Sequence, residues 1–171
     1  MSKSPSSPRN PPRRKPKRSD PWVALTRLLH YRPRTVHEAR ARLAKHGFDA
    51  DAIDAVIARA EHAGLLDDRL FVKLWINDRV LHHPLARAAV AQELRQKGIP
   101  SDWIGPALDE HYPPVREVEA AGELAEARFE RLRSIPADRR SRRTIDFLTR
   151  RGFSRGLAIE TVRRLEREHD D

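Results

Sequence analysis

The sequence contains no cysteine, few aromatic residues and no long apolar run, and each scarcity excludes a class of protein. Without cysteine there is neither a disulfide framework nor a thiolate metal site, which favours a reducing compartment such as the cytoplasm. No segment approaches the ~18 consecutive apolar residues of a membrane span, and the N-terminus lacks an apolar signal segment. We therefore expect a cytoplasmic protein that contacts no membrane, with a core of aliphatic and alanine side chains.

The familiar catalytic and ligand-binding motifs are absent as well. The chain has no GxSxG elbow, phosphate-binding loop, Gly-x-Gly fingerprint or HExxH pair, so we predict no catalytic residue, cofactor, metal or small-molecule substrate. His82 and His83 are adjacent, and neighbouring imidazoles usually point apart, so we interpret them as part of a turn. Asp67 and Asp68 stand where a helix begins and are expected to accept backbone N–H bonds there.

The positive charge is concentrated at one end. The formal net charge is +9, and residues 1–19 carry seven basic residues and no acid, which leaves 9 − 7 = +2 for residues 20–171. A segment so rich in Pro, Ser and Arg is expected to be a disordered basic tail. Such a tail would attract single- or double-stranded DNA weakly, and its alternative role is only to keep the protein soluble.

A leucine stands four residues ahead of a glycine, which a large apolar residue follows, at three places: Leu43-Gly47-Phe48, Leu94-Gly98-Ile99 and Leu148-Gly152-Phe153. This spacing is typical of a Schellman turn, in which glycine adopts a left-handed conformation and the next residue packs on the leucine. The glycines are 51 and 54 residues apart along the chain. That period is long enough for three helices in each repeat.

Apolar residues at helical spacing mark nine segments, and no stretch alternates as a strand would. We therefore predict an all-α fold of three tandem three-helix repeats in an elongated, curved array. The expected divisions are a tail, 1–19, and repeats over 20–65, 66–112 and 113–171. Leu70, Phe71, Leu74 and Trp75 are expected on one broad apolar stripe, and Val118 on the apolar face of the longest helix.

Basic residues precede the repeat glycines. Lys45, Lys97, Arg150 and Arg151 lie in final helical turns, where the helix dipole alone could favour them. If the repeats stack alike, these positions would instead form a positive ribbon facing an acidic groove or a phosphate backbone. The full set of partner or DNA contact candidates is Lys45, Arg69, Arg79, Arg87, Arg95, Lys97, Arg150 and Arg151. We expect joint replacement of Lys97, Arg150 and Arg151 by Ala to leave folding largely intact.

The segment 64–72, followed by Trp75 and Arg79, resembles the signature of the RecX family, regulators of the bacterial recombinase RecA. Further similarity lies in 32–35, in LRQKGI at 94–99 and in FLTRRGFS at 147–154, so that it covers about 22–165 in the family's order. The matching positions, which we interpret as largely structural, are Leu66, Asp67, Asp68, Phe71 and Trp75 with Gly47, Gly98 and Gly152. The chain departs from the family at 82–84, where members commonly carry glycine.

The resemblance implies three tandem three-helix repeats and a RecA filament as the partner. It further implies a protein that lies in the groove of the RecA–DNA filament and limits filament growth, ATP hydrolysis and strand exchange, with roles in DNA repair, recombination and the SOS response. Two alternatives stay open: a helical protein that binds DNA independently, and a generic helical-repeat adaptor.

Overall fold

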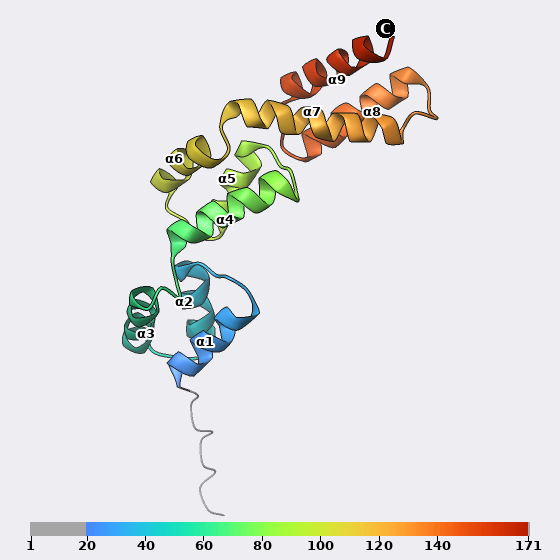
Figure 1. The fold of residues 1–171 in the computed structure, drawn as a ribbon. Coiled ribbons are helices and arrows are strands. Elements are labelled where there is room, and N and C mark those ends of the chain that lie inside the picture. The colour runs from blue at the N-terminus through green and yellow to red at the C-terminus, as the bar shows by residue number, and fades with distance from the viewer. Residues whose placement is uncertain (1–19, 171) are drawn as a thin grey trace, which may run out of the picture.

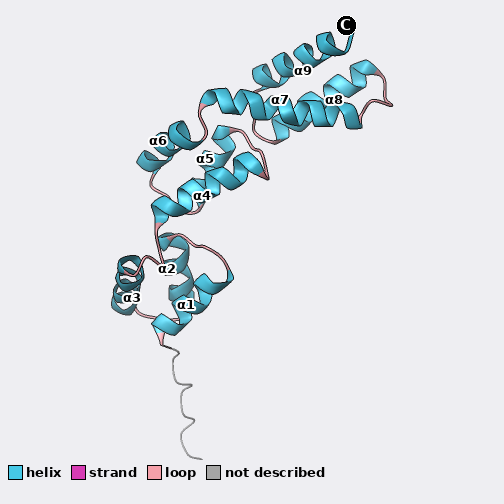
Figure 2. Cartoon of the chain, in the orientation of Figure 1, coloured by secondary structure: helices cyan, strands magenta, loops and turns pink. Residues whose placement is uncertain are grey.

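A computed structural model of the chain describes residues 20–170, and the predicted basic tail, 1–19, lies outside them. The described residues form nine α-helices and no strand (Figures 1 and 2). The helices are α1 (Pro21–Tyr31), α2 (Val36–Lys45), α3 (Ala50–His62), α4 (Asp68–Leu81), α5 (Arg87–Gln96), α6 (Ser101–His111), α7 (Pro114–Arg131), α8 (Ala137–Arg150) and α9 (Arg155–Asp170). The all-α prediction is confirmed.

The first four helices begin at side-chain caps. Asp20, Thr35, Asp49 and Asp67 each accept a hydrogen bond from a backbone N–H in the first turn of α1 to α4. Thr35 also forms a capping box, because the Glu38 side chain in turn accepts from the Thr35 N–H. Helices α5 to α8 follow Ala86 or a proline and have no side-chain cap. Their starts therefore depend more on tertiary packing.

The three predicted Schellman turns are present. Gly47, Gly98 and Gly152 have φ of 83°, 80° and 87°. The N–H of the residue after each glycine donates to the carbonyl of the leucine four residues before the glycine, at 3.4, 3.1 and 3.2 Å respectively. Each turn thus reverses the chain and starts the third helix of its trio.

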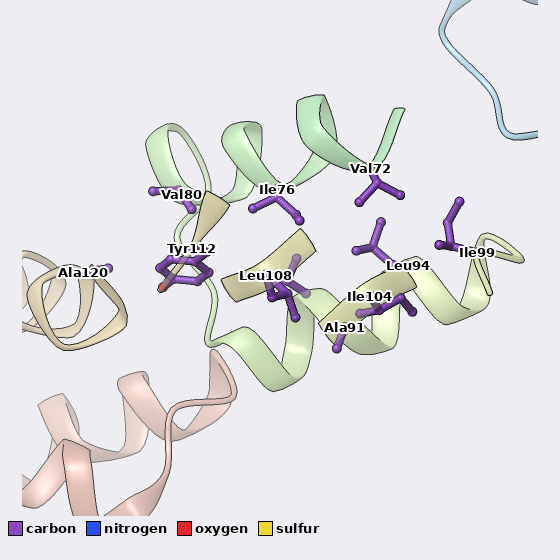
Figure 3. Packing of buried hydrophobic residues seen from close by; sticks show 11 residues of the cluster. Val72, Ile76, Val80, Ala91, Leu94, Ile99, Ile104, Leu108, Tyr112 and Ala120 are labelled. Atoms are coloured by element: carbon purple, nitrogen blue, oxygen red, sulfur yellow. The ribbon is translucent and has the colours of Figure 1, made fainter. Parts of the chain in front are cut away.

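Each trio surrounds its own apolar cluster. One cluster lies among α1–α3 around Leu25, Leu43 and Ile57, and one among α7–α9 around Phe129, Phe153 and Val162. The cluster of α4–α6 is shown in Figure 3, where side chains of α4 face those of α5 and α6. Its members include Ile76, Val90, Leu94, Leu108 and Tyr112.

The trios follow one another as an elongated, bent array, with α1–α3 at one end and α7–α9 at the other (Figure 1). We call these trios repeat 1, repeat 2 and repeat 3. Their clusters do not divide strictly at the predicted boundaries, since Leu66 joins the first cluster, Ala86 the third and Ala120 the second. The exact boundaries 20–65, 66–112 and 113–171 stay predictions.

Some predicted apolar faces are wrong in detail. Leu70 and Leu74 are each 51% exposed, so that only Phe71 and Trp75 of the predicted α4 stripe face the protein interior, and Val118 on α7 is 41% exposed. The buried residues of α4 are Phe71, Val72, Ile76 and Val80, and those of α7 are Ala120, Ala121, Ala125 and Phe129. Among the described helices, none is long and apolar enough to cross a membrane.

Candidate partner-binding surface

The Schellman turn of repeat 2 sits on the start of the second helix of repeat 1, and we call this contact the first junction. The Thr35 hydroxyl donates to the Lys97 carbonyl at 2.7 Å. Gly98, the next residue, lies so close to the His37 side chain that a Cβ on it would stand 2.3 Å from the His37 Cβ. A glycine is therefore needed here for close approach as well as for its positive φ.

The second junction repeats this geometry between repeats 2 and 3. The Ala86 N–H donates to the Arg151 carbonyl at 3.0 Å, and a Cβ on Gly152 would stand 2.8 Å from the Ala89 Cβ. In both junctions the carbonyl before a repeat glycine accepts a hydrogen bond from the residue that precedes the second helix of the previous repeat. The turn at Gly47 has no such neighbour, and nothing lies within 4 Å of a Cβ built there.

The Lys97 side chain is enclosed within the first junction. Its Nζ lies 3.9 Å from the Trp75 ring centroid and 3.3 Å from Glu38 Oε1, and its side chain is only 16% exposed. The ammonium group thus joins a cation–π contact within repeat 2 to an ion pair with repeat 1. Lys97, which the sequence suggested as a partner contact, is already occupied by the protein's own groups.

Two acids of the first junction have oppositely shifted pKa values. Burial opposes ionisation of Glu38, yet hydrogen bonds from Arg32 and Lys97 and their charges hold the pKa of this carboxyl below its usual value. Burial raises the pKa of Asp68, although its Oδ1 accepts a 2.8 Å hydrogen bond from the Val36 N–H. The predicted capping role falls to Asp67, while Asp68 tethers α4 to α2.

Arg79 and Arg87 also have internal roles. Arg79 donates to Glu93 at 2.7 Å and lies 4.2 Å from the Trp75 ring centroid. Arg87 donates to the carbonyls of Leu108 and Tyr112 at the end of α6 and to Asp109 at 2.6 Å. These bonds satisfy helix-end carbonyls that would otherwise lack partners.

Tyr112 lies at the second junction and is fully buried. Its hydroxyl donates to the Leu85 carbonyl at 3.0 Å, and burial, followed by the charge of Glu117, raises its pKa to about 12. The Glu117 carboxylate on α7 accepts from the Arg87 N–H at 2.8 Å. Repeat 3 thereby closes over the second helix of repeat 2.

The remaining candidates divide by exposure. Arg151 donates to the Pro84 carbonyl at 2.9 Å and stacks 4.8 Å from the Phe147 ring centroid, whereas Arg69 is exposed and lies over Trp103 at 4.4 Å. Lys45, Arg95 and Arg150 are exposed and form no ion pair with any described residue. The predicted ribbon is thus interrupted at both junctions, where Lys97 and Arg151 turn inward. Their joint replacement with Arg150 by Ala would remove contacts at both junctions, and the expectation of largely intact folding stays a prediction.

A basic groove of about 330 Å³ runs beside the first junction. It is lined by Arg34, His37, Glu38, Ala41, Arg42, Lys45 and Gln96. Burial and the neighbouring charges of Arg32 and Arg42 lower the pKa of Arg34, although the charge of Glu38 opposes this shift. The groove is suited to a carboxylate or phosphate group of a partner.

Sequence reasoning missed the arginines on α8. Arg139, Arg142 and Arg143 are exposed on one side of this helix, and none forms an ion pair with a described residue. The sequence of α8 contained the information, because Ser141, Thr144 and Leu148 recur at helical spacing on one face and the arginines lie between them. Glu38 and Asp68 could not be assigned to a junction, since their partners lie in another repeat. Within the described residues, no cluster of His, Asp or Glu could hold a metal ion.

Comparison with known proteins places the repeats in a family. The model described as RecX, first three-helix domain, matches residues 24–59, and RecX, second three-helix domain, matches 67–108. Proteins named Regulatory protein RecX are similar over most of the chain. That of Thermobifida fusca is 37% identical, covering 80% of this chain and 74% of its own; that of Mycobacterium avium is 36% identical, covering 86% of each.

Two crystal structures share the fold. The structure of RecX from Lactobacillus salivarius superposes with a TM-score of 0.72 at 21% identity, covering 87% of this chain and 96% of that chain. Another, of a regulatory protein RecX, has a TM-score of 0.67 at 24% identity, covering 84% and 71%. The bent array of three trios is therefore similar to experimentally determined ones.

Proposed function

This chain belongs to the RecX family of regulatory proteins, and we propose that it acts as a negative modulator of the RecA recombinase. In this proposal it binds along the groove of the RecA–DNA filament and limits filament growth, ATP hydrolysis and strand exchange. RecA regulation follows from the family; the groove and the manner of inhibition are our proposal for this chain.

The observation that carries the proposal is the repeated junction geometry. Because each Schellman turn is seated on the previous repeat, the three trios form an extended body and not a globule. A body of this shape can contact several subunits of a helical polymer at once. Contacts that are individually weak then add through effective concentration, so no single deep pocket is needed.

The contact candidates that fit this role are exposed and form no ion pair with a described residue. Lys45 lines the basic groove beside the first junction, and Arg95 and Arg150 occupy exposed helix ends in repeats 2 and 3. We propose these three as partner contacts, with Arg34 and Arg42 in the groove. Such an inhibitor acts in the cytoplasm by occupying a surface and requires no catalytic group or cofactor of its own.

The test is RecA ATP hydrolysis on single-stranded DNA, with this protein added at substoichiometric amounts before or after filament assembly. We expect inhibition in both orders, and slower filament growth when the protein is added first. Replacing Arg34 and Arg42 by Gln should weaken inhibition several-fold, while the exposed pair Arg163→Gln and Arg167→Gln on α9 serves as the matched control. Full ATP hydrolysis at saturating wild-type protein would overturn the proposal.

The exposed arginines of α8 favour a second candidate, direct DNA binding by repeat 3. Arg139, Arg142 and Arg143 would then neutralise phosphates without a recombinase. Binding to bare single-stranded DNA should weaken steeply with salt, and each arginine replaced by Gln should reduce the slope of log affinity against log salt by about 0.7. An unchanged slope in the triple variant would exclude this surface.

A further inference from the structure

Two adjoining grooves lie where repeat 1 meets the α4–α6 face of repeat 2. One, of about 440 Å³, runs between α4 and α6, and the other, of about 340 Å³, reaches the end of α3 at Glu61 and Gly64. Both are lined by Arg69 and Trp103, so the two grooves adjoin at this pair of side chains. We call the two grooves together the Trp103 channel. Asp68 and Val36 of its lining belong to the first junction, whereas the proposed filament contacts lie outside it.

The middle of the channel has an apolar floor. Val72 from α4 and Trp103, Pro106 and Ala107 from α6 line this part, and the Arg69 guanidinium lies 4.4 Å from the Trp103 ring centroid. Flat apolar surfaces of this kind suit proline rings, and aromatic-lined grooves recognise proline-rich segments. The floor alone would accept many ligands, so the charge around it decides which one fits.

The channel is the acidic part of a basic protein. Its lining includes five acids, Glu61, Asp67, Asp68, Asp102 and Glu110, against two cations, Arg69 and Lys73, which gives 2 − 5 = −3 with His111 neutral. Asp67 and Asp68 are occupied by backbone N–H groups. Asp102 and Glu61 have no ion pair within the described residues, and Glu110 approaches only His111, at 3.6 Å. Three carboxylates thus stay open to a cationic ligand.

The N-terminal segment joins the described structure at α1 of repeat 1. The chain is first described at Asp20, and Trp22 two residues later carries the Arg59 guanidinium of α3 at 3.8 Å from its ring centroid. Glu61, which lines the channel, follows Arg59 by two residues, and Gly64 by five, about 8 Å at the rise of an α-helix. Residues 1–19 are therefore attached to repeat 1, the repeat whose α3 end lines one end of the channel.

The composition of residues 1–19 complements the channel in charge and in shape. They carry +7, with no acid, and include the prolines Pro5, Pro8, Pro11, Pro12 and Pro16. Nineteen residues span at most about 60 Å when fully extended, so the segment is long enough to reach the α6 end of the channel. Because the segment is tethered, its effective concentration at the channel is high even if each contact is weak.

We propose that residues 1–19 occupy the Trp103 channel of their own chain, with basic side chains beside Glu61, Asp102 and Glu110 and prolines on the Trp103 floor. This goes beyond the proposed action on RecA, because it assigns an internal partner to the basic segment. A segment held in the channel is withheld from phosphates, so docking and DNA attraction exclude one another. The channel then competes with nucleic acid for the basic N-terminal segment.

The absence of cysteine allows a direct test on the full-length chain. A spin label on Ser7→Cys should broaden the indole N–H resonance of Trp103 in an NMR spectrum several-fold more than that of Trp75, whose Nε1 donates to Glu93 at 2.8 Å outside the channel. Asp102→Asn with Glu110→Gln should remove most of this difference. The matched pair Asp146→Asn and Glu160→Gln, exposed acids of repeat 3, should leave it unchanged.

Two outcomes would overturn the proposal. One is equal broadening of Trp75 and Trp103, or none, which would mean that the segment does not rest in the channel. The other is broadening of Trp103 in isotope-labelled, untagged protein mixed with spin-labelled, unlabelled protein, which would assign the channel to a second copy. No recombinase enters the experiment, so its failure is separate from a failure of the proposed inhibition.

Discussion

Repeat 1 meets repeat 2 through Thr35, Glu38, Asp68 and Lys97. The first apolar cluster contains no buried residue from α4, α5 or α6. Repeat 2 meets repeat 3 through a hydrogen bond to the corresponding carbonyl, donated there by a backbone N–H, but Ala86 also joins the third cluster and Ala120 the second. In both junctions the Schellman turn therefore packs at the same position on the previous repeat, but different contacts stabilise the two junctions. Polar contacts hold the first junction, and interpenetrating apolar clusters support the second.

Polar and apolar contacts contribute differently to a junction between repeats. A polar contact fixes the angle between repeats but contributes little net free energy, since each hydrogen bond replaces one to water. Shared apolar burial contributes in proportion to area and couples the folding of the two repeats. We therefore expect repeats 2 and 3 to unfold as one unit and repeat 1 to separate from them more readily.

Truncation of core side chains should have the largest effect on stability and should show which repeats unfold together. Phe153→Ala and Leu43→Ala each remove a buried side chain and should cost roughly 2 to 5 kcal/mol in free energy of unfolding. Hydrogen exchange measured by mass spectrometry should show faster exchange throughout α4–α9 for Phe153→Ala but only in α1–α3 for Leu43→Ala. Faster exchange across all nine helices in both variants would contradict separate units.

The repeat glycines should show the next largest effects. Alanine at Gly47 meets only the penalty of a left-handed conformation, about 1–2 kcal/mol, because no atom lies near a Cβ there. Alanine at Gly152 adds a clash with Ala89, which raises the loss to about 2–5 kcal/mol. Urea unfolding of the two variants checks this order. Equal losses would mean that the second junction can widen freely.

Lys97→Ala should undock repeat 1 without unfolding it. The variant loses the Glu38 ion pair and the contact with Trp75, and we expect a cost of about 1–2 kcal/mol, because the side chain is largely enclosed. Small-angle scattering should report a broader distribution of dimensions with an unchanged helical circular-dichroism signal. Lys45→Ala, which removes an exposed lysine from the last turn of α2, should change neither.

The smallest expected effect is on pH dependence. Because the pKa of Glu38 is lowered in the folded protein, its stabilisation is present above its usual value of about 4.3 and is lost as pH falls through the folded value. The raised pKa of Asp68 has the opposite effect on stability, because the penalty for burying its ionised form is relieved as pH falls. Each contribution should be below about 1 kcal/mol.

Denaturant unfolding of repeat 1 as a function of pH, followed by Trp22 fluorescence, measures these terms. Glu38→Gln should remove the loss of stability at acidic pH, while Asp68→Asn, which keeps an acceptor for the Val36 N–H, should remove the compensating gain. Identical pH profiles in both variants and the wild type would show that neither carboxyl controls the first junction.

Much of the architecture followed from local chemistry. The leucine–glycine spacing predicted all three Schellman turns, and Asp67 accepts a backbone N–H bond at the start of α4 as predicted. These features depend on residues within one turn of each other, so a sequence contains them completely. The candidate surface was less predictable, because a basic residue before a glycine is favoured by the helix dipole whether or not it meets a partner.

By itself, the sequence determined the all-α class, the three helical repeats and the family, because periodicity, capping and the segment at 64–79 are local patterns. Only the tertiary structure decided that Lys97 and Arg151 turn into junctions while Lys45 and Arg150 stay exposed. It also decided that the first junction is polar and the second is supported by shared apolar clusters. The physical reason is that the partners of these residues lie about 30 to 70 positions away along the chain, at separations that no local propensity encodes.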